Sequence, residues 1–296
     1  MFKNIVVAIS STNDCNHAIQ AGISLARSNQ ASLTIFHSCG LREHSWGDIR
    51  HLIPSGLTEQ VKKEIETNLG NTLAACPEAK IKVSVGLAHD EILRFLRSEK
   101  ADLIIMGPHS DQGATDVNPK YWGRPGTTLH KIGLKAKCPL MIVSRPWQPD
   151  FLDFRHITVG TDFSAPSKLA FHFSLKLQKH FNACVSIFHG VRLGIHEPPE
   201  EEIERQLDSA VKKMAEEYKP YLQNENYEFL SLEGNPHREL LKTARNKKSS
   251  AIILAHHSRE KMGQEPCMGS TLVNVALRSF CPVISIGREE ALLKMT

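Results

Sequence analysis

The sequence contains no apolar run that approaches the ~20 residues a membrane-spanning helix requires, which argues against a transmembrane protein. Its first residues, MFKNIVVAIS, are typical of a buried strand. They lack the basic region and long apolar region of a secretion signal. We therefore expect a protein with no cleaved leader and no membrane partner.

Cysteine occurs in a pattern that fits neither a disulfide framework nor a common zinc motif. The chain has seven cysteines, an odd number, and no two of them form a C-x-x-C pair. The neighbours His256 and His257 could join His189 or His37 in a metal site, but no H-x-x-x-H spacing supports one. We expect a reduced, cytoplasmic protein without a bound structural metal.

The sequence also lacks a large excess of charge of one sign, and it lacks common catalytic motifs. The 36 basic and 32 acidic residues leave a net charge of +4, too small and too evenly spread to indicate a nucleic-acid partner. No G-x-x-x-x-G-K-S/T is present, which disfavours a P-loop NTPase, and no G-x-S-x-G elbow is present. Ser258, His257 and Asp162 make a hydrolase triad on paper only, because an adjacent His and Ser in one loop do not form one.

What the sequence does contain is clearest in residues 251–286. A short apolar run at 252–254 is typical of a parallel strand that is covered on both faces. A polar loop then leads to Gly269, Ser270 and Thr271, which open a helix, and Cys281-Pro282 leads into a second buried strand. The first N–H groups of a helix have no partner within it, and the helix dipole favours negative charge there. The stretch therefore predicts an anion-binding site at this helix start.

The same order of elements occurs earlier, at residues 101–143, and the whole second half repeats the first. Ile35-Phe36-His37 recurs as Ile187-Phe188-His189, at an offset of 152, and Cys138-Pro139 recurs as Cys281-Pro282, at an offset of 143. Offsets that change only inside predicted loops indicate two copies of one fold.

Length and composition agree with two copies. A chain of 296 residues, 41% hydrophobic and 23% charged, can bury a core in each half. Strands that alternate with helices predict an α/β fold with a parallel sheet and right-handed crossovers. We expect a first domain at residues 1–146, a linker at 147–155 and a second domain at 156–296.

This duplicated pattern resembles the universal stress protein family in its tandem two-domain form, over nearly the whole chain. The resemblance implies two tandem domains, each a five-stranded parallel sheet with helices on both faces. The nucleotide-binding branch of that family carries an Asp just after the first strand. It also carries a G-x-x-G, nine residues and then G-S/T after the fourth strand.

The second half matches this pattern with substitutions, and the resemblance implies that its nucleotide site lies here. Ala255 and Ser258 stand at the two glycine positions, and ten residues instead of nine precede the G-S/T. The nucleotide-binding residues implied by the resemblance are Gly160, Thr161, Asp162, Ala255, His257, Ser258, Gly269, Ser270 and Thr271.

The first half departs further and is expected to hold a degenerate site. Ser10 replaces the Asp and cannot act as a charged partner of ribose or metal, and fifteen residues precede the G-T-T. The residues of this degenerate site are Ser10, Gly107, His109, Ser110, Gly126, Thr127 and Thr128. The insertion between them includes Lys120 and Arg124. These residues could contact a ligand or fold over their own domain.

The resemblance implies a cytoplasmic stress-response protein that binds ATP or a related nucleotide, with or without Mg²⁺, mainly in the second domain. Catalysis is not expected beyond slow ATP hydrolysis. The alternative is a family member without a nucleotide that acts as a protein-interaction or small-metabolite-binding module. Asp162 also has an alternative interpretation, in which its side chain caps the helix that follows it and does not contact a ligand. We expect the two halves to pack as a pseudo-dimer through edge strands at 140–143 and 283–286, and a homodimer is a further expectation.

Overall fold

The computed structural model describes residues 1–10, 16–39, 56–108, 126–193, 198–222, 226–256, 268–289 and 291. In the first half the elements are β1 (Asn4–Ile9), α1 (Asn16–Asn29), β2 (Ser32–Cys39), α3 (Leu57–Leu73), β3 (Lys80–Val85), α4 (Ala88–Ser98), β4 (Leu103–Met106), α5 (Thr127–Lys135) and β5 (Leu140–Ile142). In the second half they are β6 (His156–Gly160), α6 (Ala165–Phe181), β7 (Cys184–Val191), α7 (Glu200–Tyr218), β8 (Tyr227–Glu233), α8 (Pro236–Asn246), β9 (Ala251–Ala255), α9 (Ser270–Arg278) and β10 (Val283–Ile286). Short 3-10 helices occupy Pro149–Phe151 and Lys219–Tyr221.

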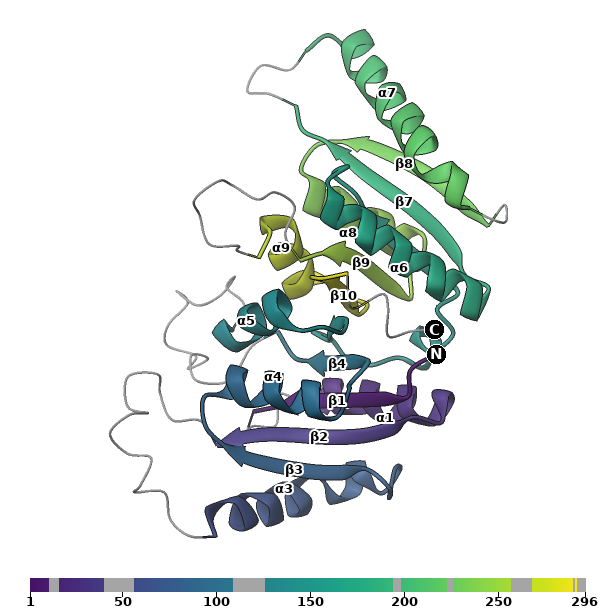
Figure 1. Cartoon of the computed structure of the whole chain (residues 1–296). Helices are drawn as coiled ribbons and strands as arrows, with labels where there is room; N and C mark the ends of the chain where they lie inside the picture. Colours follow the sequence, from purple (N-terminus) through teal and green to yellow (C-terminus); the bar gives the residue numbers. More distant parts are fainter. Residues whose placement is uncertain are drawn as a thin grey trace.

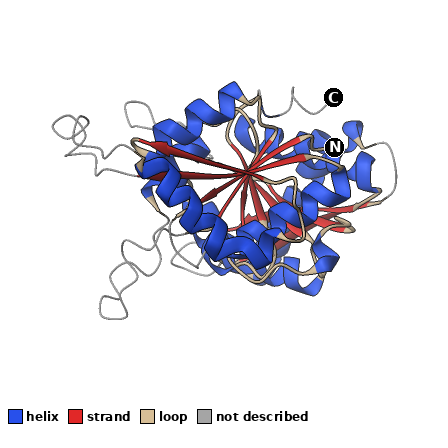
Figure 2. Ribbon diagram, turned by 90° about the horizontal axis from the view of Figure 1, so that it is seen from below, coloured by secondary structure: helices blue, strands red, loops and turns tan. Residues whose placement is uncertain are grey.

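All of these strands belong to one sheet with the order β3-β2-β1-β4-β5-β10-β9-β6-β7-β8 (Figure 1). Within the described residues each half contributes five strands, and the pairs inside each half are parallel. Helices cover both faces of the sheet, whose strands fan out when they are seen end-on (Figure 2). This arrangement confirms the predicted tandem α/β fold with mostly parallel strands.

The two halves join where β5 and β10 pair in antiparallel fashion, with Ile142 opposite Val283 and Leu140 opposite Ser285. This pairing confirms the predicted pseudo-dimer through the edge strands. It also removes two exposed sheet edges, which would otherwise present unpaired N–H and C=O groups. The buried side chains on each face of the sheet form one cluster that continues across both halves.

The repeat is visible in the backbone as well as in the sequence. The helices α1 and α6 both end beside a non-glycine residue in the left-handed region, Gln30 with φ of 53° and Asn182 with φ of 51°. The helices α4 and α8 end in the same way at Lys100 and Lys248. A left-handed residue lets a helix stop sharply and turn back toward the sheet. The two halves therefore share their turn geometry, also at Gln30 and Asn182, where the residue types differ.

No helix in the described ranges is long and apolar enough to cross a membrane.

Candidate functional site

The carboxyl ends of the parallel strands β6 and β9 lie next to each other at the same edge of the sheet. From β6 the chain crosses to β7, whereas from β9 it crosses in the other direction to β10. A crevice opens at such a reversal of strand order, and open α/β sheets bind their ligands there. The topology therefore brings the residues after β6 and after β9 to the place where a ligand is expected.

A cavity of about 550 Å³ lies at this point. Its floor is apolar, because Phe188, Leu240, Leu254 and Leu272 are all buried there. The rest of its lining comes from several elements. It includes Gly160, Thr161, Asp162, Ser167, His189, Gly190, Arg192, Ala255, Gly269, Ser270 and Thr271. An apolar floor with a few convergent polar groups is the usual form of a small-molecule site.

The start of α9 forms one wall of the cavity. Gly269 precedes the helix in an extended conformation, with φ of −60° and ψ of 139°, and no side chain caps the helix. The Gly269 N–H donates to the carbonyl of His256 at 3.0 Å, which fixes the entry into the helix. The N–H groups of Ser270 and Thr271, in the first turn, have no acceptor within the helix. They can donate to an anionic oxygen.

Asp162 forms another wall, and part of its carboxylate is already engaged. Its Oδ1 accepts hydrogen bonds from the Ser164 N–H at 3.1 Å and from the Ser164 hydroxyl. Ser164 in turn caps α6 by accepting from the Ser167 N–H at 3.3 Å. The residue that caps α6 is therefore Ser164, and Asp162 Oδ1 bonds to this cap residue instead of capping the helix itself. The same side chain also lines the cavity.

Thr161 lines the cavity, but its hydroxyl and both its backbone polar groups are hydrogen-bonded within the protein. The Thr161 hydroxyl is buried against Ser167, at 3.1 Å, and against the hydroxyl of Tyr218 on α7. Burial raises the pKa of Tyr218, although hydrogen bonds from Thr161 and Ser167 oppose that effect. These buried hydroxyls hold the end of β6 in place. Thr161 is thus a structural member of the wall.

At the end of β6, the side chain of Leu254 on β9 lies over Gly160. A Cβ atom at Gly160 would lie 2.5 Å from Leu254 Cδ2. A side chain at position 160 would therefore require Leu254 to shift at the cavity floor.

His189 and Arg192 line the cavity, although the sequence had suggested His189 only as a metal ligand and had not singled out Arg192. The His189 Nδ1 lies 2.9 Å from the Thr161 carbonyl. A carbonyl can only accept, so Nδ1 donates this hydrogen bond. His37 makes the equivalent contact with the Ile9 carbonyl at 3.0 Å in the first half. The repeated Ile-Phe-His was therefore a signal for His189, whereas no pattern marked Arg192.

Several predicted site residues lie outside the described residues. His257 and Ser258 fall in 257–267, and His109 and Ser110 fall in 109–125, as does the insertion that contains Lys120 and Arg124. Their roles stay predictions.

The first half has the same framework as the second. Gly126 precedes α5 with φ of −60° and ψ of 144°, nearly the values of Gly269, and Thr127 and Thr128 begin the helix. Ser10 follows β1 and Gly107 follows β4, as the repeat predicts. The difference is chemical, since no carboxylate stands at position 10. The degenerate site stays a prediction.

His256 is not placed to share a metal with His189. Its side chain is fully buried between the halves, where its Nδ1 lies 3.0 Å from Ser285 Oγ on β10. Its ring also fills the space above Gly133 of α5, where a Cβ atom would lie 2.0 Å from His256 Cε1. Among the described residues no three His, Cys, Asp or Glu side chains gather in a metal-binding group.

The first half also contacts the wall of the cavity in the second half. His130 on α5 accepts a hydrogen bond from the Met268 N–H at 3.0 Å, through its Nε2. Met268 directly precedes Gly269, and its side chain is buried. Burial and the neighbouring Lys131 lower the pKa of His130, which keeps Nε2 free of a proton near neutral pH. The start of α9 is thus held from both halves.

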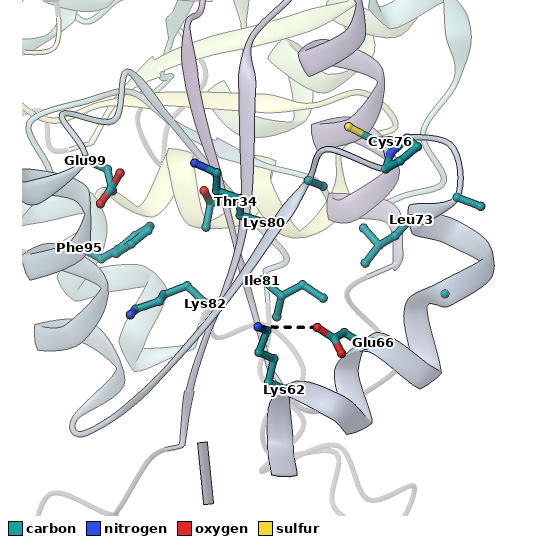
Figure 3. A pocket seen from close by; sticks show the side chains of 14 residues that line it. Thr34, Lys62, Glu66, Leu73, Cys76, Lys80, Ile81, Lys82, Phe95 and Glu99 are labelled. Carbon is teal, nitrogen blue, oxygen red and sulfur yellow. Dashed lines mark ion pairs between the residues drawn. The ribbon is translucent and has the colours of Figure 1, made fainter. Parts of the chain in front are cut away.

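A second hollow, of about 730 Å³, lies between α3 and the edge strand β3 (Figure 3). Lys62 and Glu66 lie one turn apart on α3, along one wall of the hollow, and form an ion pair of 3.9 Å between exposed side chains. The turn from α3 into β3 forms one end, so the hollow lies at the amino end of its strand. Ligands of parallel α/β sheets bind at the carboxyl ends. The cavity at Gly269 is therefore the better candidate site.

The comparisons with known proteins agree on one family. A family model described as the universal stress protein family matches residues 1–144 and 153–286. Universal stress protein YxiE of Bacillus subtilis is 22% identical over 153 residues, which are 48% of this chain and 99% of that protein.

Two solved structures are similar over nearly their whole length. A universal stress protein from Archaeoglobus fulgidus DSM 4304 is 17% identical, with 96% of both chains covered and a TM-score of 0.66. A functionally unknown protein from Pseudomonas aeruginosa PAO1 is 15% identical, with 99% of this chain and 95% of that chain covered and a TM-score of 0.57. At these identities the two structures establish the fold alone.

Proposed function

Because this chain belongs to the universal stress protein family, we propose that the cavity of its second half binds ATP or a related nucleotide. The protein would then act as a regulatory module in a cytoplasmic stress response. The observation that carries the proposal is one cavity that joins the Asp162 carboxylate to the uncapped start of α9.

Each part of a nucleotide has a matching group in this cavity. The apolar floor at Phe188 and Leu240 suits the flat base, with the backbone at Gly160 beside it. The phosphates suit the N–H groups and hydroxyls of Ser270 and Thr271 at the positive end of the α9 dipole. The remaining carboxylate oxygen of Asp162 suits a ribose hydroxyl or Mg²⁺.

The proposal includes no catalytic residue and makes the first half a support. His130 bonds to the backbone that leads into α9, so occupancy of the cavity and the packing of the two halves are coupled. Such coupling is how a binding module can report its ligand to a partner.

The proposal is tested by mass spectrometry of small molecules released from the purified protein, together with thermal unfolding in Mg·ATP. At a hundredfold excess over Kd, binding to the native state adds about 2.7 kcal/mol to stability. We expect a raised Tm in the wild type and a smaller rise in Asp162→Ala. Asp153→Ala is the matched control, because Asp153 is an exposed carboxylate paired only locally with Arg155 at 2.9 Å.

The second candidate is an interaction module that has lost the nucleotide. It is favoured by the hydrogen bonds that occupy Asp162 Oδ1 and by Ala255 and Ser258 at the family's glycine positions. No released nucleotide, together with an unchanged Tm in Mg·ATP, would support this candidate and reject the first.

A further inference from the structure

Phe163 has a backbone conformation that an aromatic residue rarely adopts. It lies between Asp162 and Ser164, in the turn from β6 into α6, and its φ is 63°. This left-handed region is disfavoured for a residue with a Cβ atom, and a bulky residue stays there only where its surroundings hold it. Whatever holds Phe163 in this conformation therefore also holds its neighbour Asp162, which lines the cavity of the second half.

The left-handed turn fixes two hydrogen bonds beside the cavity. The Phe163 N–H donates to the Thr161 hydroxyl oxygen at 3.0 Å, and the Ser164 N–H donates to Asp162 Oδ1 at 3.1 Å. If Phe163 relaxed to a negative φ, these two N–H groups would turn relative to each other, and both bonds could not persist. The orientation of the Asp162 carboxylate therefore depends on the conformation of Phe163.

The ring of Phe163 is held by two other elements, β7 and α7. Its centroid lies 4.6 Å from that of His189, a residue of β7 that lines the cavity. From α7, Lys213 Nζ lies 4.3 Å from the centroid of the Phe163 ring, and the ring of Tyr218 lies nearly parallel at 6.5 Å. Tyr218 is itself buried, and its hydroxyl is bonded to that of Thr161. Phe163 therefore connects α7 to the wall of the cavity.

We propose that Phe163 is a positioning residue that couples α7 to the ligand site of the second half. The contacts with α7 hold the ring, the ring keeps the backbone left-handed, and the backbone places Asp162. The effect on ligand binding rests on the proposed function of the cavity, whereas the coupling of α7 to the turn exists without a ligand. Because such coupling is reciprocal, a ligand that engages Asp162 or His189 should stabilise the docking of α7. The occupied cavity would then act on a partner through α7.

The variant Lys213→Ala tests this coupling from outside the cavity. Lys213 is exposed, so its side chain can be shortened without opening the core. A cation over an exposed aromatic ring should slow local opening by about two- to fivefold. In hydrogen exchange of the ligand-free full chain, a peptide that covers residues 160–166 should therefore exchange faster by that factor in Lys213→Ala. Lys212→Ala is the matched control, because it removes the same charge from the preceding exposed position, and it should exchange like the wild type.

A second variant separates the ring of Phe163 from its backbone. Phe163→Gly accepts a positive φ without strain but has no ring, so the turn can persist while the contact with α7 is lost. Adding Lys213→Ala to Phe163→Gly should then produce no further change in the exchange of residues 160–166, because both residues act through one contact. Wild-type exchange in Lys213→Ala, or equal acceleration with and without the Phe163 ring, would overturn the inference.

Ligand binding gives a third readout and separates the inference from the proposed function. In calorimetry with Mg·ATP, Lys213→Ala should bind about two- to fivefold more weakly than the wild type, whereas Lys212→Ala should bind equally well. Mg·ATP should also slow hydrogen exchange across residues 200–218 of α7 in the wild type.

Unchanged affinity in Lys213→Ala, together with no protection of α7 by Mg·ATP, would overturn the coupling to the ligand and leave the proposed function standing. If the wild type does not bind Mg·ATP, the proposed function is rejected, and exchange of the ligand-free turn still decides the role of Phe163.

Discussion

Replacing His130 tests whether the first half supports the site of the second. The variant His130→Ala removes the acceptor of the Met268 N–H, a bond of 3.0 Å to a backbone group beside a buried side chain. Leaving a buried donor without its partner costs about 1–3 kcal/mol. Because Met268 lies two residues before Ser270, we expect this loss both in the free energy of unfolding and in the affinity for Mg·ATP.

Chemical denaturation and titration calorimetry measure the two effects separately. His130→Gln keeps an acceptor oxygen near the position of Nε2 and should recover part of both losses. Lys135→Ala, an exposed change in the last turn of the same helix, should alter neither.

Acidification should have the same effect as His130→Ala on unfolding. The pKa of His130 is lowered in the folded protein, first by burial and then by Lys131. The unfolded chain therefore takes up the proton first, and stability should fall as pH drops below the ordinary value of about 6.5. If His130→Ala at neutral pH keeps the wild-type free energy of unfolding and the wild-type affinity for Mg·ATP, then the first half does not support the site of the second half.

Three further predictions concern other parts of the second half. Gly160→Val should weaken Mg·ATP binding and lower the free energy of unfolding by about 1–3 kcal/mol, because the new side chain meets Leu254 at the cavity floor. If calorimetry gives this variant the wild-type affinity for Mg·ATP, the cavity floor has room for the added side chain. Burial raises the pKa of the Cys281 thiol to about 12, so it should resist alkylation in the native protein at pH 8. Native stability should also fall above pH ~9, where the unfolded thiol ionises first, and rapid native labelling of Cys281 would contradict this. Burial would raise the pKa of Glu228, but hydrogen bonds from Lys247 and Ser186 outweigh it and lower the pKa. Glu228 should therefore contribute stability that is lost as pH falls below about 4.5. In Glu228→Gln, the free energy of unfolding should depend less on pH in this acid range. The same pH dependence in both proteins would contradict a stabilising role for the contacts of Glu228 with Lys247 and Ser186.

The fold could be predicted because its signals are local and repeated. Apolar runs at 104–105 and 252–253 indicated buried parallel strands, and the repeat identified them as equivalent. The contact between β5 and β10 was implied by the family resemblance, and its antiparallel direction was not predicted. The left-handed helix ends at Gln30 and Lys100 were not predicted, because those residue types carry no turn signal of their own.

The site could be predicted only where its residues fall within the sequence motif. Asp162 and Ser270 were expected in one site, and they line one cavity. Arg192 was missed because it follows β7, outside that motif in the sequence, and only the strand order brings its segment to the same edge of the sheet. The role of His130 was also beyond sequence reasoning, since it depends on the docking of one half on the other.

The most direct test of a single nucleotide site in the second half is photoaffinity labelling of the full chain with 8-azido-ATP, followed by mass spectrometry of its peptides. The structure predicts labelled peptides from residues 156–296, near Gly160 or Gly269, and protection of those peptides by excess ATP. Labelling confined to residues 1–146, or labelling that excess ATP does not reduce, would contradict the account.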